Sequence, residues 1–268
     1  MTTRPTVAVV GVGAMGEALA AGLLNAGWEP SELTLIVRRP ERVPQLQQRT
    51  GIEVTLSPND AAGRDVVVIA VKPRDVSALL DELKGALRPG QVLLSIAAGV
   101  PTSTYESVLG DVAVVRAMPN TPALVKEAVT GMAAGRHAGL EELEKARLVL
   151  EAVGGVQQLD EGLLDAVTAV SGTGPAYVFL LAEALTEAAV REGLPRDIAE
   201  SFVNQTIRGA GHLLTETERG PFELRSQVTS PGGTTAAAVH VLEERGFRAL
   251  VEDAVRAAAQ RARELGSA

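Results

Sequence analysis

Near the start of the chain, glycines are spaced as in turns that bind phosphates. Residues 11–16, from Gly11 to Gly16, fit the pattern G-x-G-x-x-G directly after the β-branched run Val7–Val10. In this context the glycines permit a tight turn, the approach of a pyrophosphate and close packing of a helix against a sheet, while amides at the helix N-terminus hold the phosphates. We predict a dinucleotide site here; the alternative is a glycine turn without a ligand. The expected members are Gly11, Gly13, Ala14, Met15 and Gly16.

Arginines stand where an NAD site usually carries a carboxylate. Such sites place Asp or Glu about 20 residues after the glycines, where it binds the ribose 2′-hydroxyl. Here Val37 ends a predicted strand and is followed by Arg38 and Arg39. Guanidinium groups bind a 2′-phosphate through charge-assisted hydrogen bonds, whereas a carboxylate would repel it. We therefore predict NADPH as the cofactor, with NADH still open as a donor; the alternative is that both arginines are solvated loop charges.

Two further loops follow predicted strands, and both contain proline. The first is Ala70–Pro73, and the second is Met118–Pro122. In open α/β sheets ligands bind beyond the carboxyl ends of the strands, so we expect both loops to border the nicotinamide. The cofactor-binding residues predicted from these loops are Ala70, Val71, Lys72, Pro73, Met118, Pro119 and Asn120.

A glycine-rich turn precedes a helix late in the chain. Pro231, Gly232 and Gly233 come directly before a helical stretch that begins at Thr234. Glycines allow close approach, and a helix N-terminus carries partial positive charge, so several backbone amides can bind one anion there. A substrate carboxylate suits such a turn. The alternative is an ordinary turn between helices with a threonine N-cap.

The elements that must position these loops alternate between strand and helix up to about residue 160. Asp65–Val71 is nearly all aliphatic, which is typical of a strand buried on both faces of a parallel sheet. The alternation predicts a doubly wound α/β domain of the Rossmann type. The expected strands are Val7–Val10, Leu33–Val37, Asp65–Val71, Val92–Ile96, Val112–Ala117, Thr130–Ala134 and Val156–Leu159. The expected helices are Ala14–Ala26, Pro40–Arg49, Asp75–Leu87, Thr102–Leu109 and Glu141–Val153.

After about residue 160 the strand signal ends, and Ala, Leu, Glu and Arg recur at helical spacing. We therefore predict a Rossmann NADP-binding domain over residues 1–160 and an all-α domain over residues 161–268 that binds substrate and dimerises. Apolar surface is hard to bury in so small a bundle, which favours association through this domain. The expected helices are Leu163–Val170, Pro175–Arg191, Arg196–Leu214, Thr234–Arg245 and Phe247–Leu265.

Composition and charge exclude several classes of protein. The 268 residues include no cysteine, which removes thiolate chemistry and disulfides and favours a reducing cytoplasm. A net charge of −8 without a long basic run disfavours nucleic acid or an anionic membrane as a partner. No apolar leader precedes the first strand, so we expect no signal peptide. The uncharged stretches between Arg88 and Glu106 and between Asp165 and Glu183 are interrupted by Gly, Pro, Ser and Thr, so we expect buried core rather than membrane spans.

Taken together, the motifs resemble pyrroline-5-carboxylate reductases over nearly the whole chain. The most diagnostic segments are Ser171–Tyr177 (SGTGPAY) and Ser230–Thr235 (SPGGTT), whereas many dehydrogenases share the N-terminal glycine pattern. The resemblance implies reduction of L-1-pyrroline-5-carboxylate to L-proline by NADPH or NADH, the last step of proline biosynthesis. It also implies a helical domain that dimerises, and dimers that can assemble into a decameric ring. One departure is Val37, where many members carry a small polar residue before the arginine.

The resemblance further implies roles for individual residues. It places the Thr235 hydroxyl at the ring nitrogen of the substrate, Asn59 near the adenosine ribose and Glu218 near the substrate. The loop of Lys72 lines the nicotinamide pocket, but an ammonium beside a protonated iminium is unfavourable, so we expect Lys72 to shape the loop. The implied substrate-binding residues are Ser230, Gly232, Gly233, Thr234 and Glu218.

Two other classes remain open. A β-hydroxyacid dehydrogenase has the same two-domain plan but needs a lysine on an interdomain helix, and Pro175–Arg191 contains none. A non-catalytic NADP-binding sensor would keep the fold without turnover, although the intact SPGGTT segment argues against it. The histidines lie outside every motif and lack ligand spacing, so no metal is expected; they are His137, His212 and His240.

Overall fold

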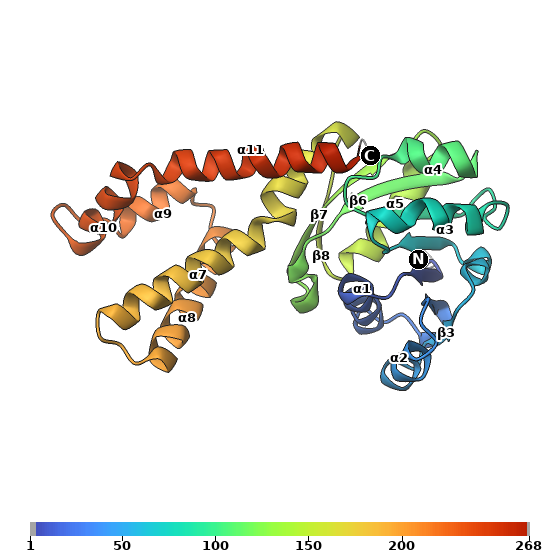
Figure 1. The fold of residues 1–268 in the computed structure, drawn as a ribbon, viewed down its shortest axis with the longest axis horizontal. Coiled ribbons are helices and arrows are strands. Elements are labelled where there is room, and N and C mark those ends of the chain that lie inside the picture. The colour runs from blue at the N-terminus through green and yellow to red at the C-terminus, as the bar shows by residue number, and fades with distance from the viewer. Residues whose placement is uncertain (1–3, 267–268) are drawn as a thin grey trace. The chain divides into compact units, whose positions relative to one another are not determined.

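The computed structural model describes residues 4–266, which form two compact units (Figure 1). The first unit consists of the chain up to Thr173 together with the segment from Ala257 onward. The second unit runs from Gly174 to Arg256. The chain therefore leaves the first unit, forms the second, and returns to the first.

The first unit is built on an eight-stranded sheet. The strands are β1 (Val7–Val10), β2 (Leu33–Ile36), β3 (Glu53–Thr55), β4 (Val66–Ile69), β5 (Val92–Ser95), β6 (Ala113–Met118), β7 (Ala128–Ala134) and β8 (Gly154–Gln158). Their order is β3-β2-β1-β4-β5-β6-β7-β8, and all neighbours are parallel except β6 and β7. The direction of winding reverses between β1 and β4, which is where ligands bind in doubly wound sheets.

Both faces of this sheet are buried. Along β1, Val7 and Val9 belong to one hydrophobic cluster, whereas Ala8 and Val10 belong to the other. Successive side chains of a strand point to opposite faces, so one cluster lies on each face. All of β4, Val66–Ile69, is buried, as the aliphatic run indicated. The predicted doubly wound α/β domain is confirmed.

Helices connect the strands of the first unit. The α-helices are α1 (Ala14–Asn25), α2 (Arg42–Thr50), α3 (Val76–Leu83), α4 (Thr102–Leu109), α5 (Leu140–Glu151) and α6 (Leu164–Val167). A π-helical turn, η6 (Thr168–Gly172), follows α6. The 3-10 turns are η1 (Pro30–Glu32), η2 (Pro58–Gly63), η3 (Pro73–Asp75), η4 (Thr121–Val125) and η5 (Glu161–Leu163). Most of these turns carry proline in their first positions, where its fixed φ favours a helical start.

The second unit contains only helices, as predicted for the C-terminal domain. They are α7 (Gly174–Arg191), α8 (Arg196–Glu216), α9 (Pro221–Gln227), α10 (Thr234–Glu244) and the first part of α11 (Phe247–Gly266). The rest of α11 belongs to the first unit, where Ala262 is buried. A Cβ on Gly99 would lie 3.3 Å from the carbonyl oxygen of Ala262, so the end of α11 packs closely on that loop.

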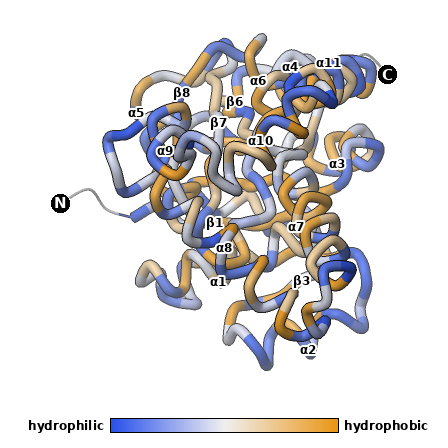
Figure 2. The backbone as a smooth tube through the Cα atoms, turned by 90° about the vertical axis from the view of Figure 1, so that its left-hand side faces the viewer, coloured by the Kyte–Doolittle hydropathy of each residue, from blue (hydrophilic) through white to orange (hydrophobic). Residues whose placement is uncertain are grey.

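The apolar stretch between Asp165 and Glu183 is buried only in part. Thr168 and Ala169 are buried in the first unit, whereas several residues of α7 are exposed in a single copy of the chain. Phe179 and Leu180 of α7 are 61% and 66% exposed, and Figure 2 shows hydrophobic residues along this helix. By length and composition, the helical run Glu161–Arg191 could even cross a membrane. The periodicity indicated an apolar helix, but it contains no information about what covers the apolar surface.

Two short elements escaped sequence prediction. Strand β3 has only three residues, two of them polar, and pairs with β2 at the edge of the sheet. Helix α9 has seven residues and begins at Pro221, with too few apolar positions for a helical period to be recognised. Strand β3 forms because β2 supplies its hydrogen-bond partners, which the local pattern does not encode.

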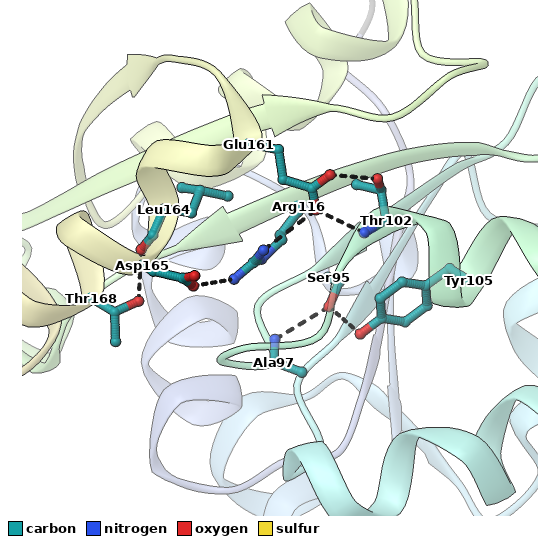
Figure 3. A network of polar contacts seen from close by, with 9 residues as sticks. All are labelled: Ser95, Ala97, Thr102, Tyr105, Arg116, Glu161, Leu164, Asp165 and Thr168. Carbon is teal, nitrogen blue, oxygen red and sulfur yellow. Dashed lines mark hydrogen bonds and ion pairs between the residues drawn. The ribbon is translucent and has the colours of Figure 1, made fainter. Parts of the chain in front are cut away.

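A buried arginine joins β6 to the segment after β8 (Figure 3). The side chain of Arg116 is only 8% exposed, and it donates to Glu161 at 3.4 Å and to Asp165 at 3.2 Å. Glu161 also accepts hydrogen bonds from the amide and the hydroxyl of Thr102, both 2.8 Å long, at the start of α4. The two carboxylates compensate the buried guanidinium, and Glu161 also compensates the positive end of the α4 dipole.

Replacing Arg116 with methionine is expected to lower the free energy of unfolding by about 2–4 kcal/mol, because two partly buried carboxylates lose their shared cation. The urea midpoint can be followed through the fluorescence of Trp28, which is the single tryptophan and lies buried in the first unit. Arg49→Met is the control, since the Arg49 side chain is 60% exposed and its ion pair should contribute little. Equal losses of unfolding free energy in the two variants would contradict the stabilising role assigned to Arg116.

Candidate active site

The glycine turn lies directly against the loop that follows β4. Gly11 has φ +93°, a conformation that favours glycine, and its amide donates to the carbonyl of Ile36 at 3.0 Å. A Cβ on Gly11 would lie 2.7 Å from Cγ1 of Val71 and 2.9 Å from the carbonyl carbon of Ala70. Only a hydrogen atom fits there, and the ends of β1, β2 and β4 meet at this point.

Gly13 and Gly16 have different surroundings. A Cβ on Gly16 would lie 2.6 Å from the carbonyl oxygen of Gly11 and 3.4 Å from Cγ1 of Val9, so this glycine lets α1 pack closely on the turn and on β1. At Gly13 the same atom would meet nothing within 4 Å among the described residues. Gly13 is also the N-cap of α1 and makes no side-chain cap. The space beside Gly13 is therefore open, and the first amides of α1 precede the intrahelical hydrogen bonds, which fits a pyrophosphate.

A cleft of about 270 Å³ opens beside the glycine turn. The ends of β1, β2 and β4 border it, together with the start of α2 and one side of α3. The predicted cofactor residues in its lining are Gly11, Gly13, Arg38, Arg39, Ala70, Val71 and Lys72. The lining residues that sequence reasoning missed include Arg42, Leu56, Pro58, Asp75 and Glu82. The arrangement fits the adenosine half of a dinucleotide, with phosphate-binding backbone at one side and guanidinium groups at the other.

Arginines from the segment between β2 and α2 line the cleft in different electrostatic settings. Nη1 of Arg38 lies 3.3 Å from a carboxylate oxygen of Asp75. Arg42 forms an ion pair with Glu17 of α1. Within residues 4–266, no carboxylate lies at ion-pair distance from Arg39. The cleft therefore contains Arg39, which has no ion-pair partner in the described part of the chain, and Arg38, which is held only weakly by Asp75.

Glu17 connects α1 to both ends of α2. It forms ion pairs with Arg42 and Arg49. Burial by itself raises the pKa of Glu17, but hydrogen bonds from the two arginines hold that pKa below its ordinary value. Glu17 is thus ionised at neutral pH and neutralises Arg42. Sequence reasoning missed Arg42 because its partner lies 25 residues away, although its place just after Arg38 and Arg39 was a signal.

The other predicted cofactor residues do not line this cleft. Met15 packs against the hydrophobic core, and the side-chain oxygen of Asn120 accepts a hydrogen bond from the amide of Val129 at 3.1 Å. Asn59 directly follows Pro58, which does line the cleft. Their contacts with a cofactor stay predictions. The residues in this group are Ala14, Met15, Gly16, Asn59, Pro73, Met118, Pro119 and Asn120.

In the second unit, the SPGGTT segment forms an open turn at the N-terminus of α10. Gly233 is the N-cap without any side-chain cap, and its amide donates to the carbonyl of Ser230 at 3.0 Å. Gly232 has φ +70°, which favours glycine. Thr234 and Thr235 are the first helical residues, so the alternative of a threonine N-cap does not hold. Their amides precede the first intrahelical hydrogen bonds and can bind an anion.

The remaining predicted substrate residues have few contacts. Thr235 is half-buried, and its hydroxyl has no hydrogen-bond partner within the described part of the chain. Glu218 is exposed in the connection between α8 and α9, and its place near the substrate stays a prediction. Among residues 4–266, no group of three or more His, Asp or Glu side chains could hold a metal ion.

Comparisons with known protein sequences point to one family. A family model of pyrroline-5-carboxylate reductase dimerisation matches residues 161–265, and a model of coenzyme F420-dependent NADP oxidoreductases matches residues 6–99. The chain is 42% identical to a pyrroline-5-carboxylate reductase from Synechocystis, over 96% of this chain and 97% of the relative. It is also 42% identical to one from Pseudomonas aeruginosa, over 98% of this chain and 97% of the relative.

Solved structures agree with the sequence relatives. A pyrroline-5-carboxylate reductase from Coxiella burnetii superimposes with a TM-score of 0.93 at 37% identity, covering 98% of this chain and 99% of that chain. A pyrroline carboxylate reductase from Plasmodium falciparum, solved with NADP bound, has a TM-score of 0.87 at 29% identity and covers 98% of both chains. A prephenate dehydrogenase from Aquifex aeolicus, at 20% identity and a TM-score of 0.55, shares the fold alone.

The fold and the glycine turn define a class of oxidoreductases with an N-terminal dinucleotide-binding domain and a helical C-terminal domain. Identity of about 40% over nearly the full length then makes the assignment specific. The chain belongs to the pyrroline-5-carboxylate reductase family. The family and the enzyme class predicted from the sequence are confirmed, and the dimerisation domain makes this protein a homo-oligomer.

Substituting alanine at Gly11 and at Gly13 separates packing from ligand approach. Gly13→Ala should keep the wild-type melting temperature but raise the Kd for NADPH about tenfold or more, because the added methyl group enters space that only a ligand needs. Gly11→Ala should lower both the melting temperature and the affinity, since its methyl group clashes with the backbone after β4. Thermal melts and fluorescence titration measure the two effects. Unchanged NADPH affinity in Gly13→Ala would rule out the pyrophosphate at this turn.

Proposed function

We propose that this protein reduces L-1-pyrroline-5-carboxylate to L-proline with NADPH as the hydride donor. Pyrroline-5-carboxylate reductase activity, the last step of proline biosynthesis, follows from membership of the family. The observation that carries the assignment to this substrate is the open turn at residues 230–235, in a chain similar to known reductases over nearly its full length. The first domain would hold the nucleotide, and the second would bind the substrate carboxylate.

NADPH is the proposed donor because of the charges beside the cleft. Arg38 and Arg39 can bind the 2′-phosphate through charge-assisted hydrogen bonds. The relative from Plasmodium falciparum has been solved with NADP bound, which supports the same cofactor here. NADH carries the same pyrophosphate and would fit the glycine turn, but it gains nothing from the two arginines. NADH is therefore proposed as a weaker second donor.

The reaction requires positioning more than reactive side chains. Bound NADPH supplies a hydride to the imine carbon, the carbon-nitrogen double bond becomes single, and the nitrogen retains a proton. The amides of the turn would hold the substrate carboxylate, helped by the positive end of the α10 dipole. Thr235 is the proposed catalytic residue at the ring nitrogen, because a hydroxyl can donate or accept a hydrogen bond without adding charge beside an iminium.

The other proposed site residues support these contacts. Lys72 is assigned to shaping its loop, since its carbonyl accepts a hydrogen bond from the amide of Asp75 at 2.9 Å and it lines the same cleft as Arg38 and Arg39. The residues proposed to surround the substrate are Ser230, Gly232, Gly233, Thr234 and Glu218.

Two competing functions are disfavoured. A β-hydroxyacid dehydrogenase would require a lysine on the helix that follows the first domain, and α7 contains none. A sensor without turnover would have no use for an open carboxylate-binding turn.

The discriminating experiment measures the rate of NADPH oxidation with pyrroline-5-carboxylate as the substrate. It compares this rate with the rates for a panel of short 2-keto and 3-oxo acids. Turnover of the imine alone supports the proposal, and preference for an oxo acid would overturn it.

We propose that the homo-oligomer forms through the helical domain as a dimer. Exposed apolar residues such as Phe179, Leu180 and Phe202 lie in the region that the dimerisation model matches. A second copy would remove this surface from water, which makes a membrane unnecessary as a cover for Glu161–Arg191. A decameric ring of dimers is the larger assembly that the family resemblance implies.

The proposed domain boundary lies after residue 160. The dimerisation model begins at residue 161, which supports this division. Residues 161–173 nevertheless pack with the first unit, because Arg116 holds Glu161 and Asp165. The cytoplasm is the proposed compartment, since a chain without cysteine suits a reducing environment.

Thr235→Val is expected to lower kcat/KM for the imine about ten- to a hundredfold, because it removes one positioned hydrogen bond and keeps the shape. The Kd for NADPH should not change, since the glycine turn lies in the other domain. The assay follows NADPH absorbance. Thr215→Val is the control, because Thr215 is exposed on α8 and outside the proposed site. Wild-type efficiency in Thr235→Val, or loss of NADPH binding with activity, would refute the role.

Light scattering of the purified protein is expected to give a mass of at least two chains, because a monomer would leave the apolar surface of α7 in water. The mass should fall only on strong dilution, as in an associating system. Adding excess mild detergent tests whether the association is hydrophobic. A single-chain mass that does not depend on concentration would exclude the proposed dimer.

A further inference from the structure

The cofactor cleft contains a carboxylate that no phosphate-binding role explains. Asp75 lines the cleft, and its Oδ1 lies 3.3 Å from Nη1 of Arg38. We propose that Asp75 determines cofactor specificity: it competes with the 2′-phosphate of NADPH for Arg38 and accepts a hydrogen bond from the 2′-hydroxyl of NADH. This inference rests on the proposed use of NADPH in this cleft.

The backbone holds Asp75 in place. Its amide donates to the carbonyl of Lys72 at 2.9 Å, within the 3-10 turn that Pro73 begins. The next residue, Val76, starts α3, and its side chain is only 2% exposed. The chain cannot shift outward here without exposing Val76 to water. Asp75 is therefore a fixed negative charge at the wall of the cleft.

Arg38 is the more exposed partner of the pair. Its side chain is 60% exposed, against 31% for Asp75, and it follows a strand end rather than lying within a helix. An exposed ion pair of this kind is weak, so a bound phosphate can compete for the guanidinium. A 2′-phosphate carries close to two negative charges at neutral pH, and it must draw Arg38 away from Asp75 while it is repelled by the same carboxylate.

The same carboxylate suits the unphosphorylated cofactor. NAD sites use an acidic side chain at the end of the second strand to bind the ribose 2′-hydroxyl. In this chain that position carries Arg38, and the carboxylate comes from the loop after β4 instead. One cleft thus combines a cation for the phosphate with an acceptor for the hydroxyl. Asp75 therefore weakens NADPH binding and supports NADH binding, so the difference between the two affinities becomes smaller.

The neighbouring carboxylate Glu82 is a poorer candidate. It also lines the cleft, but in the described part of the chain it forms no ion pair with Arg38 or with any other cation. It is on the last turns of α3, two turns beyond Asp75. The effect on the 2′ position is therefore assigned to Asp75.

The test is a titration of the full-length protein with NADPH and with NADH. Asp75→Asn keeps the side-chain size and removes the charge, and it should lower the Kd for NADPH about three- to tenfold while leaving or raising the Kd for NADH. Asp81→Asn is the matched control, because Asp81 is exposed on the same helix but does not line the cleft. It should change neither Kd. Equal changes for both cofactors in Asp75→Asn would overturn the specificity role.

Arg38→Ala, alone and combined with Asp75→Asn, distinguishes the inference from the proposed function. If Asp75 acts through Arg38, the fold decrease in the Kd for NADPH that Asp75→Asn causes should be at most half as large when Arg38 is also replaced by alanine. Weaker NADPH binding in Arg38→Ala with no effect of Asp75→Asn would overturn the inference alone. Unchanged NADPH binding in Arg38→Ala would overturn the proposed phosphate contact and the inference with it.

Discussion

The cleft proposed for the cofactor depends on the close approach of the glycine turn to the backbone after β4. At Gly11 no atom larger than hydrogen fits between the turn and the residues Ala70 and Val71. This contact brings the carboxyl ends of β1 and β4 together where the winding of the sheet reverses. The arginines after β2 and the carboxylate after β4 line one cleft. They can do so because Gly11, which has no side chain, lets the two strand ends lie close together. Gly11 is therefore required for packing, whereas Gly13 leaves space that a ligand can occupy.

Charge in the cleft is balanced rather than simply positive. Glu17 pairs with Arg42 as well as with Arg49, Asp75 pairs weakly with Arg38, and no carboxylate of the described residues lies at ion-pair distance from Arg39. A phosphate entering the cleft exchanges one protein partner for a stronger one, so the net gain is smaller than the count of arginines suggests. In the second unit, the turn proposed to bind the substrate carboxylate contains no cationic side chain and would rely on backbone amides, which titrate at no accessible pH.

Features that repeat locally were predictable from the sequence, and features that join distant residues were not. Aliphatic runs predicted β1 and β4, since burial on both faces of a parallel sheet selects such runs, and helical spacing predicted the longer helices within a few residues. The glycine pattern and Arg38 are also local features, and the structure places Gly11, Gly13 and Arg38 in the lining of one cleft. The pairing of Arg38 with Asp75 spans 37 residues, and that of Arg116 with Asp165 spans 49, so no local pattern reports either. The exposed apolar residues of α7, such as Phe179 and Leu180, were not predicted either, because helical spacing does not report how far a helix is covered.

The return of the chain to the first unit has a consequence for the order of synthesis. The ribosome makes the sheet first, then the helical unit, and only afterwards the segment from Ala257 that packs beside Gly99. The surface around Gly99 therefore stays uncovered while the whole second unit emerges. A domain made early is thus completed by residues made late, and its native packing cannot be finished co-translationally in a simple N-to-C sequence.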